Sequence, residues 1–359
     1  MNFKMKIGIY SPYLDTVGGG ERYVLSIAEI LSKDNSVDIF IDSHLETFDI
    51  DKIKEKTSLL LDLDLSQVKF IKGPFGKGSG FLERLKFLKK YDLLFYLTDG
   101  SVFYSSAGKS ILHIQSPIKA NNGNLWKRIK KSSWNLIIYN SQFTKDNCEK
   151  FWGLNGEVIY PPVNIEVFKS GKKKKQILTV GRFFGFLKDK KHQLMIDTFK
   201  KMADSGKIKD WSFHMAGGVG DGDKEYVKEL QDIIGRYPVY IHPNLPFGEL
   251  RKMYSESSIY WHAAGFGETD PTRMEHFGIT TVEAMASGCV PVVINKGGQK
   301  EIVEDGVNGF LWDEPEELES KTMSLILDKK LMEKLSKSAQ QSVRKFSKEE
   351  FSKKIKSLL

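Results

Sequence analysis

Short apolar runs alternate with amphipathic segments along almost the whole chain, and this alternation limits the possible fold more than any other feature of the sequence. Residues 6–12 form a strand-like run, a glycine turn follows, and residues 21–33 then repeat apolar side chains at helical spacing. The later runs of this half are short, β-branched or aromatic, and bounded by Gly, Pro, Asn or Asp: residues 36–42, 92–100, 110–117 and 135–142. Strands that alternate with helices predict an α/β protein whose parallel sheets are covered by helices on both faces.

A break in this pattern separates two halves of similar size. Pro161 and Pro162 are followed by Gly171 and the lysine run 172–175, which is a composition typical of a linker. After the break the alternation of strand-like and helix-like segments starts again, and it ends in a polar helical tail from Glu314. The sequence therefore predicts two successive βα domains, residues 1–170 and residues 171–359.

The composition agrees with a globular protein of this size. The chain has 359 residues, of which 40% are hydrophobic and 28% are charged, and no apolar run is long enough to span a bilayer. The first apolar run stops at Pro12 and Asp15 without a cleavage site, so we expect no signal peptide and a cytoplasmic protein. Cys148 and Cys289 are too few for a disulfide framework and have no metal-ligand spacing.

Positive charge is concentrated in one window of the first half. Between Lys69 and Lys131 there are 13 basic and three acidic residues, a balance of 13 − 3 = +10, whereas the whole chain carries +8. Aromatic residues such as Phe81 and Trp126 lie in the same window. Such a surface can bind an anionic membrane, a nucleic acid or a phosphorylated substrate, and a lysine-rich face can also be only solvated. A peripheral contact with the inner face of an anionic membrane is one interpretation, and a solvated face is the other.

Two carboxylates frame a turn and a helix start in the second half. Glu275 precedes a Phe-Gly turn, Thr280 or Thr281 is the expected N-cap, and Glu283 would then lie in the first helical turn. Between the two carboxylates, main-chain amides and the positive end of the helix dipole predict an anion site. A diphosphate suits the amides, and sugar hydroxyl groups suit the carboxylates, so the segment predicts a site for a diphosphate with a sugar on each side.

Two other patterns suggest different chemistry. The pairs Asp62/Asp64 and Asp221/Asp223 resemble metal-binding Asp-x-Asp motifs, but their surroundings favour surface positions. The glycines of residues 217–222 do not fit the G-x-G-x-x-G fingerprint of a dinucleotide fold. We expect neither a metal nor a nicotinamide cofactor.

The segment from Glu275 to Glu283, with its internal F-G-I and the following EAMASGCVPVV, resembles glycosyltransferase family 4, the retaining nucleotide-sugar transferases of the GT-B fold. The resemblance extends over nearly the whole chain and includes a GGGER loop similar to that of lipid-linked oligosaccharide mannosyltransferases. The matching blocks follow in the order of the family: residues 11–31, 111–117, 140–146, 158–168, 180–183, 191–199 and 297–312. The resemblance implies two Rossmann-like domains with an interdomain cleft, an N-terminal acceptor domain, a C-terminal donor domain, and a last helix that packs back on the N-terminal domain.

The resemblance also implies roles for individual residues. Arg182 and Lys190 would bind the diphosphate, Glu275 would hold the transferred sugar, and His113 would lie near its anomeric centre. The other implied substrate-binding residues are Gly19, Gly20, Gly217, Gly218, Phe277, Gly278, Ile279, Thr280 and Glu283. The segment between Arg182 and Lys190 is longer than is usual in the family, so Lys188 and Lys191 remain alternatives to Lys190. The loop of residues 265–274 is a second departure, which can shape the sugar pocket or close over it.

These expectations describe a hexosyltransferase of glycan biosynthesis that moves a hexose from GDP-mannose or a UDP-sugar to a lipid-linked or glycan acceptor. Two alternatives remain open at this point. One is a sugar-nucleotide 2-epimerase of the same architecture, and the other is a non-enzymatic basic protein that binds nucleic acid. No recognition helix, zinc motif or aromatic platform supports the second alternative, so we expect no nucleic-acid partner.

Overall fold

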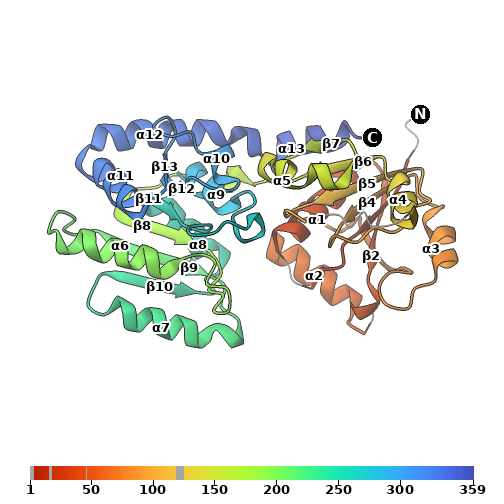
Figure 1. Ribbon diagram of the computed structural model, residues 1–359, viewed down its shortest axis with the longest axis horizontal. Helices are drawn as coiled ribbons and strands as arrows, with labels where there is room; N and C mark the ends of the chain where they lie inside the picture. Colours follow the sequence, from red (N-terminus) through yellow and green to blue (C-terminus); the bar gives the residue numbers. More distant parts are fainter. Residues whose placement is uncertain (1–3, 16–17, 46, 119–124) are drawn as a thin grey trace. The chain divides into compact units, whose positions relative to one another are not determined.

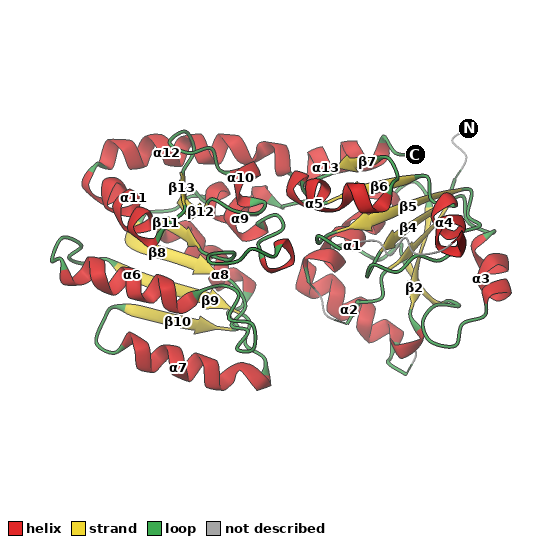
Figure 2. Ribbon diagram, in the orientation of Figure 1, coloured by secondary structure: helices red, strands yellow, loops and turns green. Residues whose placement is uncertain are grey.

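The computed structural model describes residues 4–15, 18–45, 47–118 and 125–359. Its internal contacts divide the chain into two compact units. Unit 1 comprises residues 1–162 together with residues 349–359, and unit 2 comprises residues 163–348. The sequence predicted the boundary at residue 170, a few residues later than this division. Each unit is an α/β layer structure in which every strand pairing is parallel (Figures 1 and 2).

Unit 1 is built on a seven-stranded sheet with the order β3-β2-β1-β4-β5-β6-β7. Its strands are β1 (Lys6–Tyr10), β2 (Ser36–Ile41), β3 (Lys69–Lys72), β4 (Leu93–Leu97), β5 (Lys109–Ile114), β6 (Leu136–Tyr139) and β7 (Gly156–Val158). Its helices are α1 (Gly19–Leu31), α2 (Ile50–Leu61), α3 (Phe81–Leu88), α4 (Leu125–Ser132), α5 (Gln142–Trp152) and, from Glu349 on, α13 (Lys348–Lys356).

The apolar run of β4 shows why these strands read as continuous hydrophobic stretches. All five of its residues are buried, because successive side chains point to opposite faces and both faces are covered. Leu93, Phe95 and Leu97 face a core shared with α1 and α13. Leu94 and Tyr96 face a second core, which is rich in aromatic rings and shared with α3 and α5.

Unit 2 contains a six-stranded sheet with the order β10-β9-β8-β11-β12-β13. Its strands are β8 (Lys174–Val180), β9 (Ser212–Gly217), β10 (Val239–Pro243), β11 (Ser257–His262), β12 (Val290–Ile294) and β13 (Phe310–Trp312). Its helices are α6 (His192–Asp204), α7 (Lys224–Ile234), α8 (Phe247–Glu256), α9 (Ile279–Ala286), α10 (Gln299–Ile302), α11 (Pro315–Leu327) and α12 (Lys329–Ser342). Neighbouring helices α6, α7 and α11 form one layer, and α8 and α9 belong to another.

The strand order of unit 2 reverses between β8 and β11. The chain leaves β8 toward β9 and β10 on one side and returns through β11 toward β12 and β13 on the other. In an open parallel sheet such a reversal leaves a crevice outside the carboxyl ends of the two central strands, and ligands bind there. Within the described residues, no helix combines the length and the apolarity needed to cross a membrane.

Candidate functional site

At the carboxyl ends of β8 and β11, the predicted residues Lys190 and Glu275 lie beside a third polar residue, His262. β8 ends at Val180 and leads through Gly181 into the loop that carries Lys190, while β11 ends at His262. The Lys190 ammonium lies 2.9 Å from Glu275 Oε2, and His262 Nε2 lies 3.2 Å from the same oxygen. The stem of Lys190 runs along Gly181, where an added Cβ would lie 3.0 Å from Lys190 Cγ.

The charges of this cluster stabilise one another. Burial raises the pKa of Glu275, but the charge of Lys190 and the hydrogen bond from His262 outweigh burial and hold it well below its ordinary value. Burial lowers the pKa of Lys190, but the charge of Glu275 outweighs it and leaves a net increase. Burial lowers the pKa of His262 despite the nearby carboxylate, so this ring is neutral near pH 7. Because a carboxylate only accepts, Nε2 of His262 carries the proton and donates it to Glu275.

Three lysines lie within four residues of one another, and the structure gives each a different partner. Lys188 pairs with Glu229 of α7 at 2.7 Å and lies over the Tyr226 ring. Lys191 pairs with Glu268 at 2.6 Å. Lys190 is the one that reaches Glu275. The geometry thus favours Lys190 over Lys188 and Lys191 as the cation of the site, as the match to the family had suggested.

Helix α9 begins two or three residues earlier than expected. The prediction of Thr280 or Thr281 as N-cap is wrong: Gly278 occupies that position with φ +122°, a conformation that favours glycine. The two threonine hydroxyls instead bind other side chains, Thr280 that of Tyr260 at 2.8 Å and Thr281 that of Gln299 at 2.9 Å. The amides of Ile279 and Thr280 open the helix and have no intrahelical acceptor, so they suit an anion.

Glu283 therefore lies in the second turn of α9 rather than in the first. Its side chain is mostly buried, at 7% exposure, and its Oε2 accepts a hydrogen bond from the Tyr254 hydroxyl at 3.1 Å. Phe277, on the turn before the helix, is 3% exposed and packs edge-on against Phe346. This contact anchors the turn that precedes α9.

Two glycines that follow β12 determine where the Glu275 backbone lies. A Cβ on Gly297 would lie 2.2 Å from the Glu275 carbonyl oxygen, and one on Gly298 would lie 2.5 Å from Phe277 Cα. The amide of Gly298 also donates to the Glu275 carbonyl at 2.8 Å. Sequence reasoning assigned no role to either glycine or to His262, although a Gly-Gly pair that follows a buried strand after two intervening residues indicates a close backbone approach.

Gly217 and Gly218 lie at the end of β9, next to the end of β8. A Cβ on Gly217 would lie 1.8 Å from the Gly181 carbonyl oxygen, so only glycine fits there. A Cβ on Gly218 would make ordinary contacts, 3.7 Å from Arg182 Cγ and 3.9 Å from Asn244 Oδ1. Arg182 itself is exposed, and its positive charge acts on Lys190.

The predicted residues of unit 1 lie around the start of α1. His113, in β5, is fully buried, and its ring stacks on Tyr23 of α1 with centroids 3.8 Å apart. Burial lowers the pKa of His113 to about 3. Gly19 is the first residue of α1, and a Cβ on Gly20 would lie 2.1 Å from Gln115 Oε1. The predicted roles of these residues next to a sugar stay predictions.

The Asp-x-Asp pairs have local partners. Asp62 ends α2 in the left-handed conformation, and Asp64 accepts from the Ser66 amide. Asp223 accepts from the Gly185 amide at 2.9 Å. Across the described ranges, no three His, Cys, Asp or Glu residues come together in a way that could hold a metal ion.

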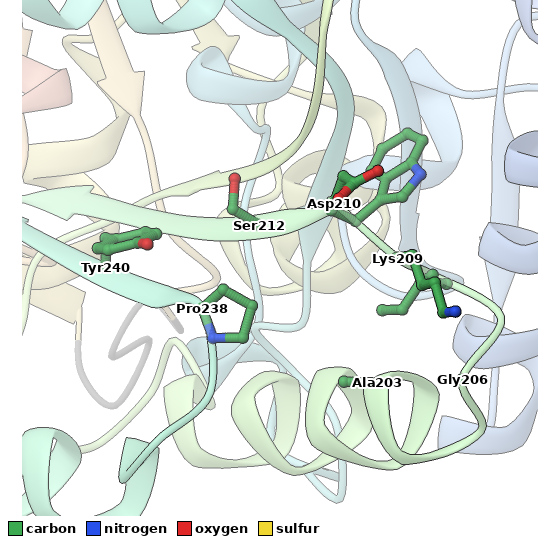
Figure 3. A pocket seen from close by; sticks show the side chains of 9 residues that line it. Ala203, Gly206, Lys209, Asp210, Ser212, Pro238 and Tyr240 are labelled. Atoms are coloured by element: carbon green, nitrogen blue, oxygen red, sulfur yellow. The ribbon is translucent and has the colours of Figure 1, made fainter.

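A pocket of about 350 Å³ lies at the other end of the unit 2 sheet (Figure 3). It is lined by residues at the amino ends of β9 and β10 and at the end of α6, among them Trp211, Ser212, Pro238 and Tyr240. Because the strands are parallel, this pocket lies a full strand length away from Lys190 and Glu275. None of the predicted site residues lines it.

Both the sequence and the structure of the chain resemble those of known proteins. Residues 162–342 match the model of the glycosyl transferases group 1. The human GDP-Man:Man(3)GlcNAc(2)-PP-Dol alpha-1,2-mannosyltransferase is 29% identical over 236 residues, which cover 60% of this chain and 46% of that protein. The chain thus spans about half the length of this curated relative.

Solved structures resemble the chain over its whole length. HepE of Anabaena, in complex with UDP and glucose, has a TM-score of 0.73 at 19% identity and 99% coverage of both chains. A glycosyltransferase from Rickettsia africae has a TM-score of 0.76 at 16% identity, with 99% and 98% of the two chains covered. These likenesses confirm the predicted two-domain α/β fold of the GT-B class. The family match over residues 162–342 shows that the chain belongs to the group 1 glycosyl transferases.

Proposed function

We propose that the protein is a retaining hexosyltransferase that uses a nucleoside-diphosphate sugar as donor. The observation that carries the proposal is the cluster of Lys190, His262 and Glu275 at the reversal of the unit 2 sheet, directly before the N-terminus of α9. Cation, helix N-terminus and carboxylate are the three partners that a diphosphate joined to a sugar requires. Retention of the anomeric configuration is the outcome that the family resemblance implies.

Departure of the diphosphate is the step that this cluster can assist. A nucleoside diphosphate leaves readily only if its developing negative charge is stabilised in place. Lys190 and the amides of Ile279 and Thr280 supply positive charge and donors that the fold fixes before the donor binds. The exposed Arg182 adds a second positive charge beside them. The proposal assigns this stabilisation to the chain's own residues and requires no metal ion.

The carboxylate of Glu275 would hold the transferred sugar. It is ionised near pH 7 because its pKa lies well below the ordinary value, so it accepts hydrogen bonds from hydroxyl groups. His262 and Lys190 both bind its Oε2, which fixes the orientation of the group. Glu283 is held by Tyr254 and would receive the ribose hydroxyls of the donor.

The choice of donor and acceptor rests on the relatives. The name of the human relative includes GDP-mannose and a lipid-linked glycan, whereas the structure of HepE contains UDP and glucose. Both donors therefore belong in the test, and a lipid-linked or glycan acceptor is proposed for this chain.

Thermal unfolding with a panel of GDP- and UDP-sugars tests the proposal. A donor at about 100 times its dissociation constant adds about 2.7 kcal/mol of stability, which raises the Tm by roughly 5–10 °C for a unit of this size. Nuclear magnetic resonance of the product formed from the best donor should show the anomeric configuration of the donor. Turnover without acceptor would point to the epimerase, and a panel without any shift at millimolar concentration would refute the proposal.

Unit 1 carries a surface that suits an acceptor embedded in a membrane. Five apolar side chains on α3 and α4 are exposed: Phe81, Leu82, Leu125, Trp126 and Ile129. Basic residues of the same helices and their flanks accompany them, although residues 119–124 of the basic window lie outside the described part. The loop between β4 and β5 joins the helices, because Ser106 binds the Leu85 carbonyl and the Ser105 amide binds Ser133 just after α4.

We include in the proposal that this surface, the exposed side chains of α3 and α4, contacts the anionic inner face of a membrane. Sedimentation with liposomes should recover the protein only when anionic lipid is present, and recovery should fall as salt rises. Trp126→Asp should reduce recovery. Leu59→Asp is the control, because Leu59 is also a large, exposed hydrophobic side chain (80% exposed) but lies on α2. Equal losses in the two variants, or recovery without anionic lipid, would contradict the membrane contact.

A further inference from the structure

Lys191 lies beside the proposed diphosphate site and has two energetically unfavourable local features. It has φ +55°, a left-handed conformation that is strained for any residue with a side chain. It is also the N-cap of α6, without a side-chain cap, where its positive charge opposes the helix dipole. A residue that carries both penalties is held in place by something outside its own helix.

Glu268 supplies that hold from the loop of residues 265–274. Its Oε1 lies 2.6 Å from Lys191 Nζ, and the two side chains are only 11% and 23% exposed. Arg273 Nη2 lies 3.2 Å from the same oxygen, and Lys296 Nζ donates a hydrogen bond to the Glu268 carbonyl oxygen at 3.1 Å. The carboxylate therefore has a fixed position, independent of Lys191, from which it can fix the lysine.

Two consecutive lysines thus form ion pairs with two glutamates of the same segment. Lys190 pairs with Glu275 and Lys191 pairs with Glu268, seven residues earlier. The backbone of Glu275 is already held by Gly298. What remains to be fixed is the direction of Lys190, and this direction depends on the turn that Lys191 makes.

We propose that Glu268 is a positioning residue: it holds Lys191 in the left-handed conformation and thereby directs the neighbouring Lys190 toward Glu275 and the diphosphate. The inference rests on the proposed function, because it assigns Lys190 to the leaving group. When a diphosphate draws Lys190 away from Glu275, the pair between Lys191 and Glu268 stays intact and keeps the turn. The long loop before Glu275 then has a role that sequence reasoning left open.

A glycine at residue 191 distinguishes this positioning role from a role in which the ion pair only stabilises the loop. Glu268→Gln removes the charge that holds Lys191, and kcat should fall on the order of tenfold as the strained turn relaxes. Lys191→Gly removes the same ion pair but lets residue 191 adopt the left-handed conformation without strain. Lys191→Gly and the double variant with Glu268→Gln should therefore keep kcat within about threefold of the parent. If the ion pair only stabilised the loop, Lys191→Gly would lower kcat as much as Glu268→Gln, and that result would overturn the inference.

The control is Glu319→Gln, which removes another single lysine–glutamate pair of α6, that with Lys201. This pair is more exposed and distant from the site, so kcat should change by less than about twofold. Hydrogen exchange of residues 188–192 provides a readout that needs no activity. Exchange should be at least about tenfold faster in Glu268→Gln and return to the parent rate in the double variant. Unchanged exchange in Glu268→Gln would refute the inference, whereas a lack of donor turnover in the parent would refute only the proposed function.

Discussion

Replacing Gly217 with alanine places a methyl group against the backbone of a neighbouring strand. The added Cβ would lie 1.8 Å from the Gly181 carbonyl oxygen, and real Cβ contacts are not shorter than 3.0 Å. The ends of β8 and β9 must therefore separate by about 1.2 Å, that is 3.0 − 1.8 Å. The obstacle is main chain rather than a flexible side chain, so a change of rotamer does not relieve it.

The cost follows from the bonds that join these strand ends. The Gly181 amide binds the Ala216 carbonyl and the Phe183 amide binds the Gly218 carbonyl, both at 2.9 Å. A separation of 1.2 Å breaks both bonds, each worth about 1 kcal/mol, and leaves buried polar groups without partners. We expect a loss of about 3 kcal/mol, which lowers the Tm by roughly 6–12 °C. The same displacement moves Arg182, and a shift of about 1 Å costs on the order of 100-fold in rate.

Thermal unfolding and transfer assays of three alanine variants check this reasoning. Gly222→Ala is the control, because nothing lies within 4 Å of its added Cβ, and it should leave both Tm and rate unchanged. Gly218→Ala should also keep the Tm, since its new contacts are of ordinary length, but it should weaken donor binding if the nucleotide packs on that backbone. A Gly217→Ala variant that melts with the parent protein and transfers sugar at the parent rate would refute the reasoning.

Three further predictions concern the cluster around Glu275. Lys190→Met should lower stability by about 2 kcal/mol, because it leaves a partly buried carboxylate without its cation, and calorimetry should show at least about tenfold weaker donor binding. The pKa of Glu275 is depressed in the folded state, so the stability that Glu275 contributes is complete above its ordinary pKa and declines as the pH falls toward the folded value. In Glu275→Gln, the free energy of unfolding measured with denaturant should therefore depend less on pH over this acid range, and most transfer activity should be lost. His262→Leu removes a hydrogen bond to the carboxylate, so the acid limb of the pH–stability profile should move to higher pH. An unchanged limb would mean that His262 does not act on Glu275.

The alternation of apolar and amphipathic segments was sufficient to predict the fold class, because buried parallel strands need continuous apolar runs and their crossovers need helices. The same local patterns located the frame of Glu275 and Glu283 and the start of a helix between them. The N-cap of α9 could not be predicted from propensity. Threonine is a favoured N-cap, but the packing of Gly297 and Gly298 against the turn places Gly278 there instead.

Pairings over long sequence separations were the other part that local patterns could not supply. Nothing in the local sequence distinguishes the side chains of Lys188, Lys190 and Lys191, because their partners come from α7 and from the segment before α9. His262 is a buried residue at the end of β11, and its hydrogen bond to Glu275 depends on the position of the loop before α9, which local patterns do not supply. The family resemblance selected Lys190 from the sequence, and the geometry favours the same residue for a physical reason.

The position of a bound donor tests the central proposal most directly. A crystal structure with GDP or UDP, whichever binds, should place the diphosphate within hydrogen-bond distance of Lys190 Nζ and of the amides of Ile279 and Thr280. A nucleotide bound instead in the pocket of Trp211 and Tyr240, at the opposite end of the unit 2 sheet, would contradict the proposed site and the roles derived from it.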